Sequence, residues 1–465
     1  MWPPFNEQKA GFVLERVIDS LKQKKISLSR SSSLSDGRNI SQVMLGCLVG
    51  KDTSGNTVEC IALSGITCRL EGCENFVECI ASPEDIEKAL EQNDREIHEL
   101  TAKISNFPPN HHACHELKKQ REELCLVSLL KVFLLYDFCC IDGSIKNIFE
   151  LTGDFSKKPS LEELMEKVKS KKITLPPTGT GDCCAPKLLH YAFLHHIQPV
   201  SMAETRLRFT LRENSCILNE ELISSPPVLE PPCDSRCSFL LPGMTGLNIV
   251  YRDEYIIVVN KQSGILSVPG RTEKDCISNR VRRLFPDCID QPAVHRLDME
   301  TSGLMVLAFT KEAHRELSRQ FESKEVKKMY TALIDGIPSK KGFASEGEME
   351  LFFRVDLDNR PHQIWDEQYG KKAVTRWKFE DVEYYTDPLG NRRPVTRVSF
   401  IPLTGRTHQL RLAAASPKGF GCPIIGDSLY GCCLPGERLL LHASYLSFAH
   451  PVSKKKLVFK SKCEF

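Results

Sequence analysis

Residues 295–309 read HRLDMETSGLMVLAF, in which a polar cluster leads directly into an apolar run. The run from Gly303 to Phe309 predicts a buried β-strand, because it is short and continuously apolar. His295, Arg296 and Asp298 stand just ahead of it. A buried charge without a partner is costly, so a cluster at this position needs a reason. The residues alone leave two explanations of the cluster open: a structural ion pair or a catalytic group.

Two further polar clusters interrupt or end strand-like runs in the same part of the chain. They are Lys328-Met329-Tyr330 and Gly405-Arg406-Thr407-His408-Gln409-Leu410-Arg411. A carboxylate that is held by an arginine stays ionised near neutral pH, which suits a nucleophile. An aromatic side chain nearby can stack against a planar ring. We therefore expect Asp298 to pair with one of the arginines.

The pattern around these clusters predicts an α+β domain built on a large mixed, mostly antiparallel sheet. Two strand-like runs lie within residues 247–261, and helices are expected at 278–284 and 311–323. Further strands are expected at the following ranges: 328–334, 373–383, 397–402 and 408–414.

Composition indicates an ordinary globular protein whose two halves differ in charge. No apolar run reaches the roughly 18 to 20 residues that a membrane span needs, and the N-terminus lacks the order of a secretory signal, so we expect a cytoplasmic protein. Residues 244–465 contain 34 Lys and Arg against 27 Asp and Glu, a net charge of +7, which leaves −5 for residues 1–243. A basic surface of this kind favours a polyanion as the partner of the C-terminal part.

The first half divides into three expected segments. Residues 1–81 contain a β-hairpin around Asp52-Thr53-Ser54-Gly55-Asn56. Residues 82–175 begin with the helix-start pattern Ser82-Pro83-Glu84-Asp85 and predict an antiparallel helical hairpin, which is either a packing element or an RNA-contacting arm. Residues 176–243 form a connecting segment rich in Cys and Pro, and residues 244–465 are expected to form one domain that contains the three polar clusters.

The cysteines are too dilute for a disulfide framework. Most are expected to be small buried thiols, and the expected site contains no metal. An alternative is a zinc site built from Cys183, Cys184, Cys233 and Cys237, with His190 as a further candidate ligand. The spacings differ from those of an ordinary zinc ribbon.

The block from about Val250 to the C-terminus resembles the RluA-type pseudouridine synthases, which isomerise uridine in rRNA or tRNA. HRLDMETSGLMVLA is similar to the catalytic motif of that family, VKKMYTALIDG to its second motif and LTGRTHQLRL to its third. Supporting segments follow in the expected order: NKQSGILSVPGR at 260–271, GCPIIGDSLYG at 421–431 and LLLHASYLSFAHP at 439–451. One departure is Ala413, where the family usually has a histidine.

The resemblance implies a function and a set of site residues. Asp298 would be the catalytic carboxylate, and Arg411 the arginine that pairs with it. Tyr330 would stack on the flipped uracil and could also serve in proton transfer at carbon 5. The expected RNA-binding residues are Arg296, His295, Lys328, Arg406, His408 and Arg271. Arg296 would fill the space left by a flipped uridine.

The expected reaction needs no cofactor, and the expected partner is RNA, with no membrane and no required protein partner. A monomer is the default for such a family. Met299 and the segment SVPGR at 267–271 favour the branch that modifies both a tRNA anticodon stem-loop and large-subunit rRNA. The alternatives are a non-catalytic RNA-binding or ribosome-assembly protein with the same fold, and a hydrolase that uses Asp298 with His295.

Overall fold

The computed structural model describes residues 5–30, 42–107, 112–212, 215–218, 227–230, 236–272, 275–463 and 465. These residues form two compact units that divide between Gly246 and Leu247. The three segments expected before residue 244 therefore lie mainly within one unit. None of the helices in the described residues is both long and apolar enough to cross a membrane.

The first unit has a four-stranded sheet in the order β3-β2-β7-β8. Its helices are α1 (Gln8–Lys22), α2 (Pro83–Ser105), α3 (His112–Phe133), α4 (Ile148–Leu151), α5 (Leu161–Lys169), α6 (Cys184–Leu194) and α7 (Cys237–Thr245). Its strands are β1 (Ser27–Arg30), β2 (Gln42–Lys51), β3 (Thr57–Leu63), β4 (Cys68–Glu71), β5 (Asp137–Cys139), β6 (Ile145–Asn147), β7 (Gln198–Arg212) and β8 (Ser215–Leu218). One side of α1 packs its apolar residues, among them Leu14, against Leu45 and Leu207 of the sheet.

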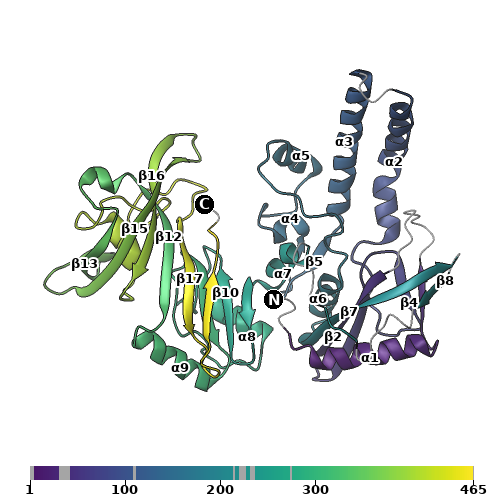
Figure 1. The fold of residues 1–465 in the computed structure, drawn as a ribbon, viewed down its shortest axis with the longest axis horizontal. Helices are drawn as coiled ribbons and strands as arrows, with labels where there is room; N and C mark the ends of the chain where they lie inside the picture. Colours follow the sequence, from purple (N-terminus) through teal and green to yellow (C-terminus); the bar gives the residue numbers. More distant parts are fainter. Residues whose placement is uncertain are drawn as a thin grey trace. The chain divides into compact units, whose positions relative to one another are not determined.

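The expected hairpins of this unit are confirmed. Strands β2 and β3 pair antiparallel on either side of the turn at residues 52–56. Helix α2 begins as predicted, because the Ser82 hydroxyl oxygen accepts a hydrogen bond from the Asp85 N–H at 3.0 Å. Figure 1 shows α2 and α3 side by side, and the buried Asn93 amide donates to the Ser128 hydroxyl between them at 3.0 Å.

The second unit is built on a ten-stranded sheet in the described residues, which confirms the predicted fold class. The order is β14-β13-β15-β16-β12-β17-β11-β10-β9, with β18 also paired to β17. The strands are β9 (Ile249–Arg252), β10 (Ile256–Lys261), β11 (Ser302–Ala308), β12 (Lys327–Asp335), β13 (Glu346–Val355), β14 (Gln363–Trp365), β15 (Lys371–Thr386), β16 (Arg392–Pro402), β17 (Leu441–Ala449) and β18 (Lys456–Lys460). Its helices are α8 (Ile277–Leu284), α9 (Lys311–Glu322), the 3-10 helix η2 (Pro338–Lys341) and α10 (Gln409–Ala415).

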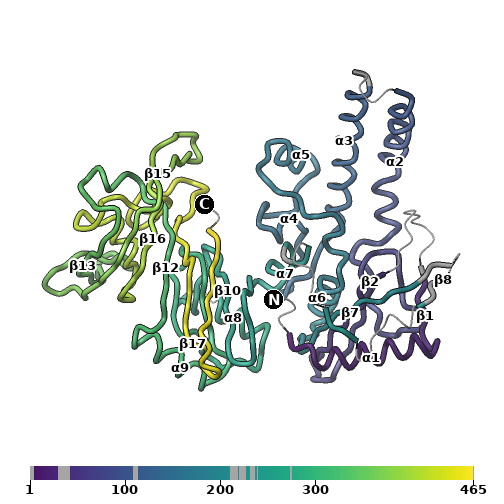
Figure 2. Tube along the Cα trace, viewed as in Figure 1, coloured from purple at the N-terminus to yellow at the C-terminus, as the bar shows by residue number. Residues whose placement is uncertain are grey.

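Strand β11, expected from the apolar run, lies near the middle of this sheet and is buried along its whole length. It pairs antiparallel with β10 and parallel with β17. In Figure 2 the late strand β17 (yellow) runs among strands from the beginning of the unit, as these pairings require. The sheet thus brings the start of β11 beside segments more than a hundred residues away along the chain.

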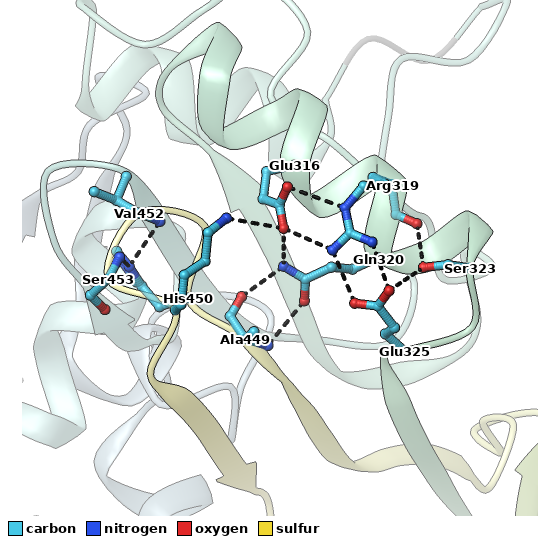
Figure 3. Close-up of polar contacts among 10 residues, drawn as sticks. Glu316, Arg319, Gln320, Ser323, Glu325, Ala449, His450, Val452 and Ser453 are labelled. Atoms are coloured by element: carbon cyan, nitrogen blue, oxygen red, sulfur yellow. Dashed lines mark hydrogen bonds and ion pairs between the residues drawn. The ribbon is translucent and has the colours of Figure 1, made fainter.

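Helix α9 is tied to the end of β17 through one buried glutamine. The Gln320 amide donates to the Ala449 carbonyl at 2.9 Å and accepts from the Ala449 N–H at 3.0 Å, as a neighbouring strand would (Figure 3). The apolar side of α9, with Ala313 and Leu317, packs against Val306 of β11. This packing supports the strand that follows Asp298.

The prediction of a strand at 408–414 is wrong, because residues 409–415 form helix α10. His408 adopts a left-handed conformation with φ 54° and turns the chain into the helix. Leu410, Leu412 and Ala413 are all buried, so neither a strand-like nor a helical alternation of polarity is visible. The helix turns Arg411 toward the interior, where the arginine is only 2% exposed.

We predict that Gly303→Ala lowers the free energy of unfolding by about 3 kcal/mol or more. Gly303 has φ 116°, and a Cβ there would lie 2.4 Å from the Ala443 nitrogen in the facing strand β17. Gly390 has φ 88° but open space around it, so Gly390→Ala should cost only about 1–2 kcal/mol of backbone strain. Urea unfolding of both variants measures the difference, and equal losses would show that the contact with β17 is unimportant.

Candidate active site

The backbone of the loop that carries Asp298 is held by a serine from the segment after β10. The Ser267 hydroxyl donates to the Leu297 carbonyl at 2.7 Å and accepts from the Leu297 N–H at 2.9 Å. Ser263 donates to the Glu300 carbonyl at 2.6 Å. Because the residues on both sides of Asp298 are fixed, the direction of its carboxylate is restricted.

Lys261, at the end of β10, is buried and forms a hydrogen bond with the same loop. Its side chain is 1% exposed. Its ammonium donates to the carbonyls of Gln262 at 3.0 Å, Ile265 at 2.7 Å and Met299 at 2.9 Å. Burial lowers the pKa of Lys261 to about 7, while the charge of Asp298 acts in the opposite direction. All three ammonium hydrogens are therefore used to join two segments of the site.

Arg411 is the largest buried cation of the site. Its Nε donates to Asp427 Oδ2 at 2.9 Å and its second terminal nitrogen to Asp427 Oδ1 at 2.5 Å. The same nitrogen forms an ion pair with Glu300 at 2.8 Å. Burial acts to lower the pKa of Arg411, but the hydrogen bond and charge of Asp427, with the charges of Glu300 and Asp298, raise it overall.

This geometry modifies the expected role of Arg411. The sequence predicted a pair between Arg411 and Asp298, whereas the direct contacts of the guanidinium are with Asp427 and Glu300. The charge of Asp298 still acts on Arg411, so the two groups are near each other. Asp427 lies in the supporting segment 421–431, but no role was predicted for it, because its partner Arg411 stands 16 residues earlier in the chain.

Tyr330 and Lys328 come from the first half of β12. Burial raises the pKa of the Tyr330 phenol, and the negative charge of Asp298 raises it further. Burial also lowers the pKa of Lys328, whose ammonium lies 5.6 Å from the centre of the Phe321 ring. The phenol therefore stays protonated at neutral pH, and it lies close enough to Asp298 to feel its charge.

The loop before α10 is rigid because Gln409 bridges it to β15. The Gln409 amide oxygen accepts from the Thr404 hydroxyl at 2.7 Å and from the Arg406 N–H at 3.0 Å. Its nitrogen donates to the Val374 carbonyl and to the Thr375 hydroxyl, both at 2.9 Å. These bonds fix the position of the exposed Arg406.

His408 belongs to a second polar chain at the site. Its Nδ1 lies 2.7 Å from the hydroxyl of Tyr430, which also accepts from the Gln363 N–H at 2.8 Å. Burial lowers the pKa of His408, although the charge of Asp298 opposes the effect. The Arg411 guanidinium lies 5.5 Å from the centre of the Tyr430 ring, so the aromatic ring supports both residues.

Seven of the nine predicted site residues line one cleft, which we call the catalytic cleft. They are Arg296, Asp298, Lys328, Tyr330, Arg406, His408 and Arg411. Thr301, Thr404 and Gln409 are among the other residues of its wall. His295 and Arg271 are not among the residues that line it, and Arg271 is exposed next to Gly270.

His295 has a structural environment that differs from the expected RNA-binding role. Its Nε2 accepts a hydrogen bond from the Val306 N–H at 3.1 Å, and its ring stacks on Phe321 with centroids 4.6 Å apart. Burial lowers the pKa of His295 to about 3, helped by the charge of Lys328. A neutral ring that accepts from a strand backbone is a part of the scaffold.

The alternative zinc site receives no support from the described residues. Cys233 lies outside them, and no group of three or more His, Cys, Asp or Glu side chains within them is placed to hold a metal. The Cys184 thiol donates to the carbonyls of Met44 at 3.3 Å and Ala62 at 3.5 Å. Burial raises the pKa of Cys184 well above its usual range, which opposes the thiolate that zinc requires.

We predict that Lys261→Met lowers kcat at least about tenfold and the free energy of unfolding by about 3 kcal/mol, because three carbonyls that surround the buried lysine lose their donor. Lys311→Met is the control, since that lysine is exposed at the start of α9. Steady-state kinetics and urea unfolding of the two variants measure these effects. Wild-type kcat in Lys261→Met would show that the loop keeps its position without the lysine.

We predict that His295→Gln makes the second unit less sensitive to acid. Between pH 6.5 and pH 3 the unfolded chain binds a proton on His295 that the folded chain cannot bind, so stability falls as the pH falls. Removing the imidazole should reduce this slope by up to about 1.4 kcal/mol per pH unit. Urea unfolding from pH 7 to pH 4.5 measures the slope, and an unchanged slope would contradict the assignment.

Known proteins resemble the second unit. Residues 255–416 match the family model described as RNA pseudouridylate synthase. The dual-specificity RNA pseudouridine synthase RluA of Escherichia coli (strain K12) is 43% identical over 229 residues, which are 48% of this chain and 96% of that protein. The protein of the same name from Haemophilus influenzae is 42% identical over 224 residues, 47% of this chain and 94% of the relative.

Among solved structures, human RNA pseudouridylate synthase domain containing 1 is 29% identical and covers 46% of this chain and 83% of that one, with a TM-score of 0.38. That structural likeness is too low to add to the fold described above. The sequence match instead spans nearly all of the Escherichia coli relative at high identity. The chain belongs to the RluA-type family of RNA pseudouridine synthases.

Proposed function

We propose that this protein isomerises specific uridines to pseudouridine in structured RNA, with Asp298 as the catalytic carboxylate. The observation that carries the proposal is the catalytic cleft itself, where Asp298, Tyr330 and Arg411 come together from three separate segments. The loop of Asp298 is anchored by Lys261 and Ser267. A fixed loop is expected where a carboxylate must be held in one orientation toward its substrate.

The reaction rearranges bonds within one nucleotide. The bond between ribose carbon 1′ and ring nitrogen 1 breaks, the uracil turns, and carbon 1′ joins ring carbon 5. The hydrogen on carbon 5 leaves as a proton, and nitrogen 1 gains a proton. Nothing is oxidised or reduced, so the chemistry needs no cofactor.

Asp298 attacks either ribose carbon 1′ or the uracil ring, and both routes require an ionised carboxylate beside the base. Arg411 supports that charge from within the wall of the cleft. Because Asp427 and Glu300 hold the guanidinium, it keeps a fixed position near Asp298. Arg411 is thus a positioning residue whose positive charge acts on the reacting carboxylate.

Tyr330 forms a wall against which the flipped uracil stacks. Its raised pKa keeps the phenol protonated, so it offers a hydrogen-bond donor at neutral pH. A phenolate that removes the proton from carbon 5 would be scarce under these conditions. We therefore propose that Tyr330 stacks on the uracil and donates a hydrogen bond, and that it does not act as the base that removes the proton from carbon 5.

The base must leave its stack before the reaction, since neither face of the glycosidic bond is open within a helix. Arg296 is exposed at the mouth of the cleft, where it can fill the vacated space or hold a phosphate. Lys328 and Arg406 line the same cleft. Arg271 is exposed and follows Gly270, which lines a neighbouring cavity. These cations suit a polyanion, in line with the net charge of +7 over residues 244–465.

For the substrate, we propose a tRNA anticodon stem-loop and large-subunit rRNA. The Escherichia coli and Haemophilus influenzae relatives are both named dual-specificity enzymes. Met299 and the segment at 267–271, on which the sequence-based prediction of this branch depends, border the catalytic loop. The protein would act in the cytoplasm as a monomer without a protein partner.

We predict that Asp298→Asn lowers pseudouridine formation by more than about a thousandfold while RNA binding persists. The substrates are a tRNA anticodon stem-loop and a large-subunit rRNA fragment labelled with tritium at uridine carbon 5, and the readouts are tritium release and chemical mapping. Asp290→Asn is the matched control, because that carboxylate is 90% exposed.

Each result has a distinct meaning. Full turnover by Asp298→Asn would make the assignment of the carboxylate wrong. Binding of both RNAs by the wild-type protein with no pseudouridine in either would support the alternative of a non-catalytic RNA-binding protein.

A further inference from the structure

A second cavity adjoins the catalytic cleft and shares the Asp298 loop with it. Its volume is about 410 Å³, within the range of pockets that hold small ligands. Arg296, Leu297, Asp298, His408 and Arg411 contribute to the walls of both spaces. If the target nucleotide of an RNA strand enters the catalytic cleft, a neighbouring nucleotide of that strand lies close to the second cavity.

The walls that belong only to this second cavity are mostly apolar. They come from the segment 266–270, from Met299, from Pro361 in the loop between β13 and β14, and from Leu429. Proline and leucine side chains offer flat or broad apolar surfaces to a nucleobase. The hairpin that supplies Pro361 is itself tied to the site, because the Gln363 N–H donates to Tyr430 at 2.8 Å.

Glu300 places a fixed negative charge in this apolar wall. Its Oε1 accepts from the Ser428 hydroxyl at 2.6 Å, and its Oε2 pairs with Arg411 at 2.8 Å. The side chain is 26% exposed, and a carboxylate oxygen has two acceptor positions. Each oxygen can therefore accept one more hydrogen bond from a group in the cavity.

The charge decides which part of an RNA fits. Arg296 and Arg411 reach this cavity from the shared wall and attract phosphate there, whereas the wall that carries Glu300 repels phosphate and attracts a donor such as the amino group of a base. Uracil is less suitable, because its only ring donor lies between two carbonyl oxygens that would face the same charge. The cavity thus suits an amino-bearing base.

Building on the proposed function, we propose that this cavity binds the nucleobase next to the target uridine, and that Glu300 selects adenine, cytosine or guanine over uracil there. Ser428 is the positioning residue that aims Glu300. The competing possibility is that Glu300 serves only to hold Arg411. The two differ in one respect: a contact with Arg411 affects all RNAs equally, whereas a contact with a base affects them unequally.

The experiment uses the full chain and a set of anticodon stem-loops that carry each of the four bases on either side of the target uridine. Both kcat/KM from tritium release and Kd are measured for each RNA. The variants are Glu300→Gln and Ser428→Ala, and the control is Glu367→Gln, which changes an exposed glutamate outside both spaces. Thermal unfolding checks that each variant is folded.

At one flanking position, the wild-type protein should prefer amino-bearing bases over uracil by roughly tenfold, as expected for one discriminating contact with a base edge. Glu300→Gln should reduce this ratio to about twofold, because an amide can also donate to the oxygens of uracil. Ser428→Ala should reduce the same ratio, because Glu300 loses the hydroxyl that orients it. Glu367→Gln should keep the full ratio.

Two results would overturn the assignment of this cavity. One is turnover by the wild type with no preference at either flanking position, which leaves the proposed function intact. The other is an equal fall of kcat/KM on all RNAs in Glu300→Gln, which limits Glu300 to its contact with Arg411. A preference in Kd without any pseudouridine formation would instead support the cavity and reject the proposed function.

Discussion

The hydrogen bonds that join residues 261–267 to residues 297–300 are the constraint on which the site depends. A loop carries Asp298, and a loop alone would let its carboxylate swing. Lys261 donates a hydrogen bond to the Met299 carbonyl, and the Ser267 hydroxyl donates to the Leu297 carbonyl. The same hydroxyl accepts a hydrogen bond from the Leu297 N–H. Since the Leu297 N–H and carbonyl are buried, loss of their partner would cost more than the bonds themselves contribute. The loop therefore has one favoured position.

A second constraint concerns the buried charge of Arg411. A guanidinium that is 2% exposed is stable only when its donors are satisfied, and Asp427 meets two of them in parallel. Glu300 adds a further contact at the edge of the neighbouring cavity. The charge of the Arg411 guanidinium can then act on Asp298, although the direct ion pairs of Arg411 are with Asp427 and Glu300. The same side chain thus connects Asp298, the proposed catalytic carboxylate, with the cavity proposed to bind a neighbouring base.

The sequence predicted those parts of the site whose signals are local. The apolar run after Asp298 indicated β11, and Ser82 with Pro83 indicated the start of α2. Helix α10 was mistaken for a strand, because all its faces are buried and its polarity does not alternate. Lys261 and Asp427 were missed as well, since their importance comes from partners 38 and 16 residues away along the chain. A pattern within a short window contains no information about such contacts.

The first unit presents a different electrostatic surface, which bears on the two interpretations of its helical hairpin. Helix α2 has seven acidic residues against three Lys and Arg, so phosphates would be repelled along most of its length. Helix α3 offers four Lys and Arg against three acids, which is too small an excess to compensate. The polar bridge from Asn93 to Ser128 and Lys131 lies between the helices and serves their packing. These charges favour a packing or spacing element over an RNA-contacting arm, and they leave RNA recognition to the basic second unit.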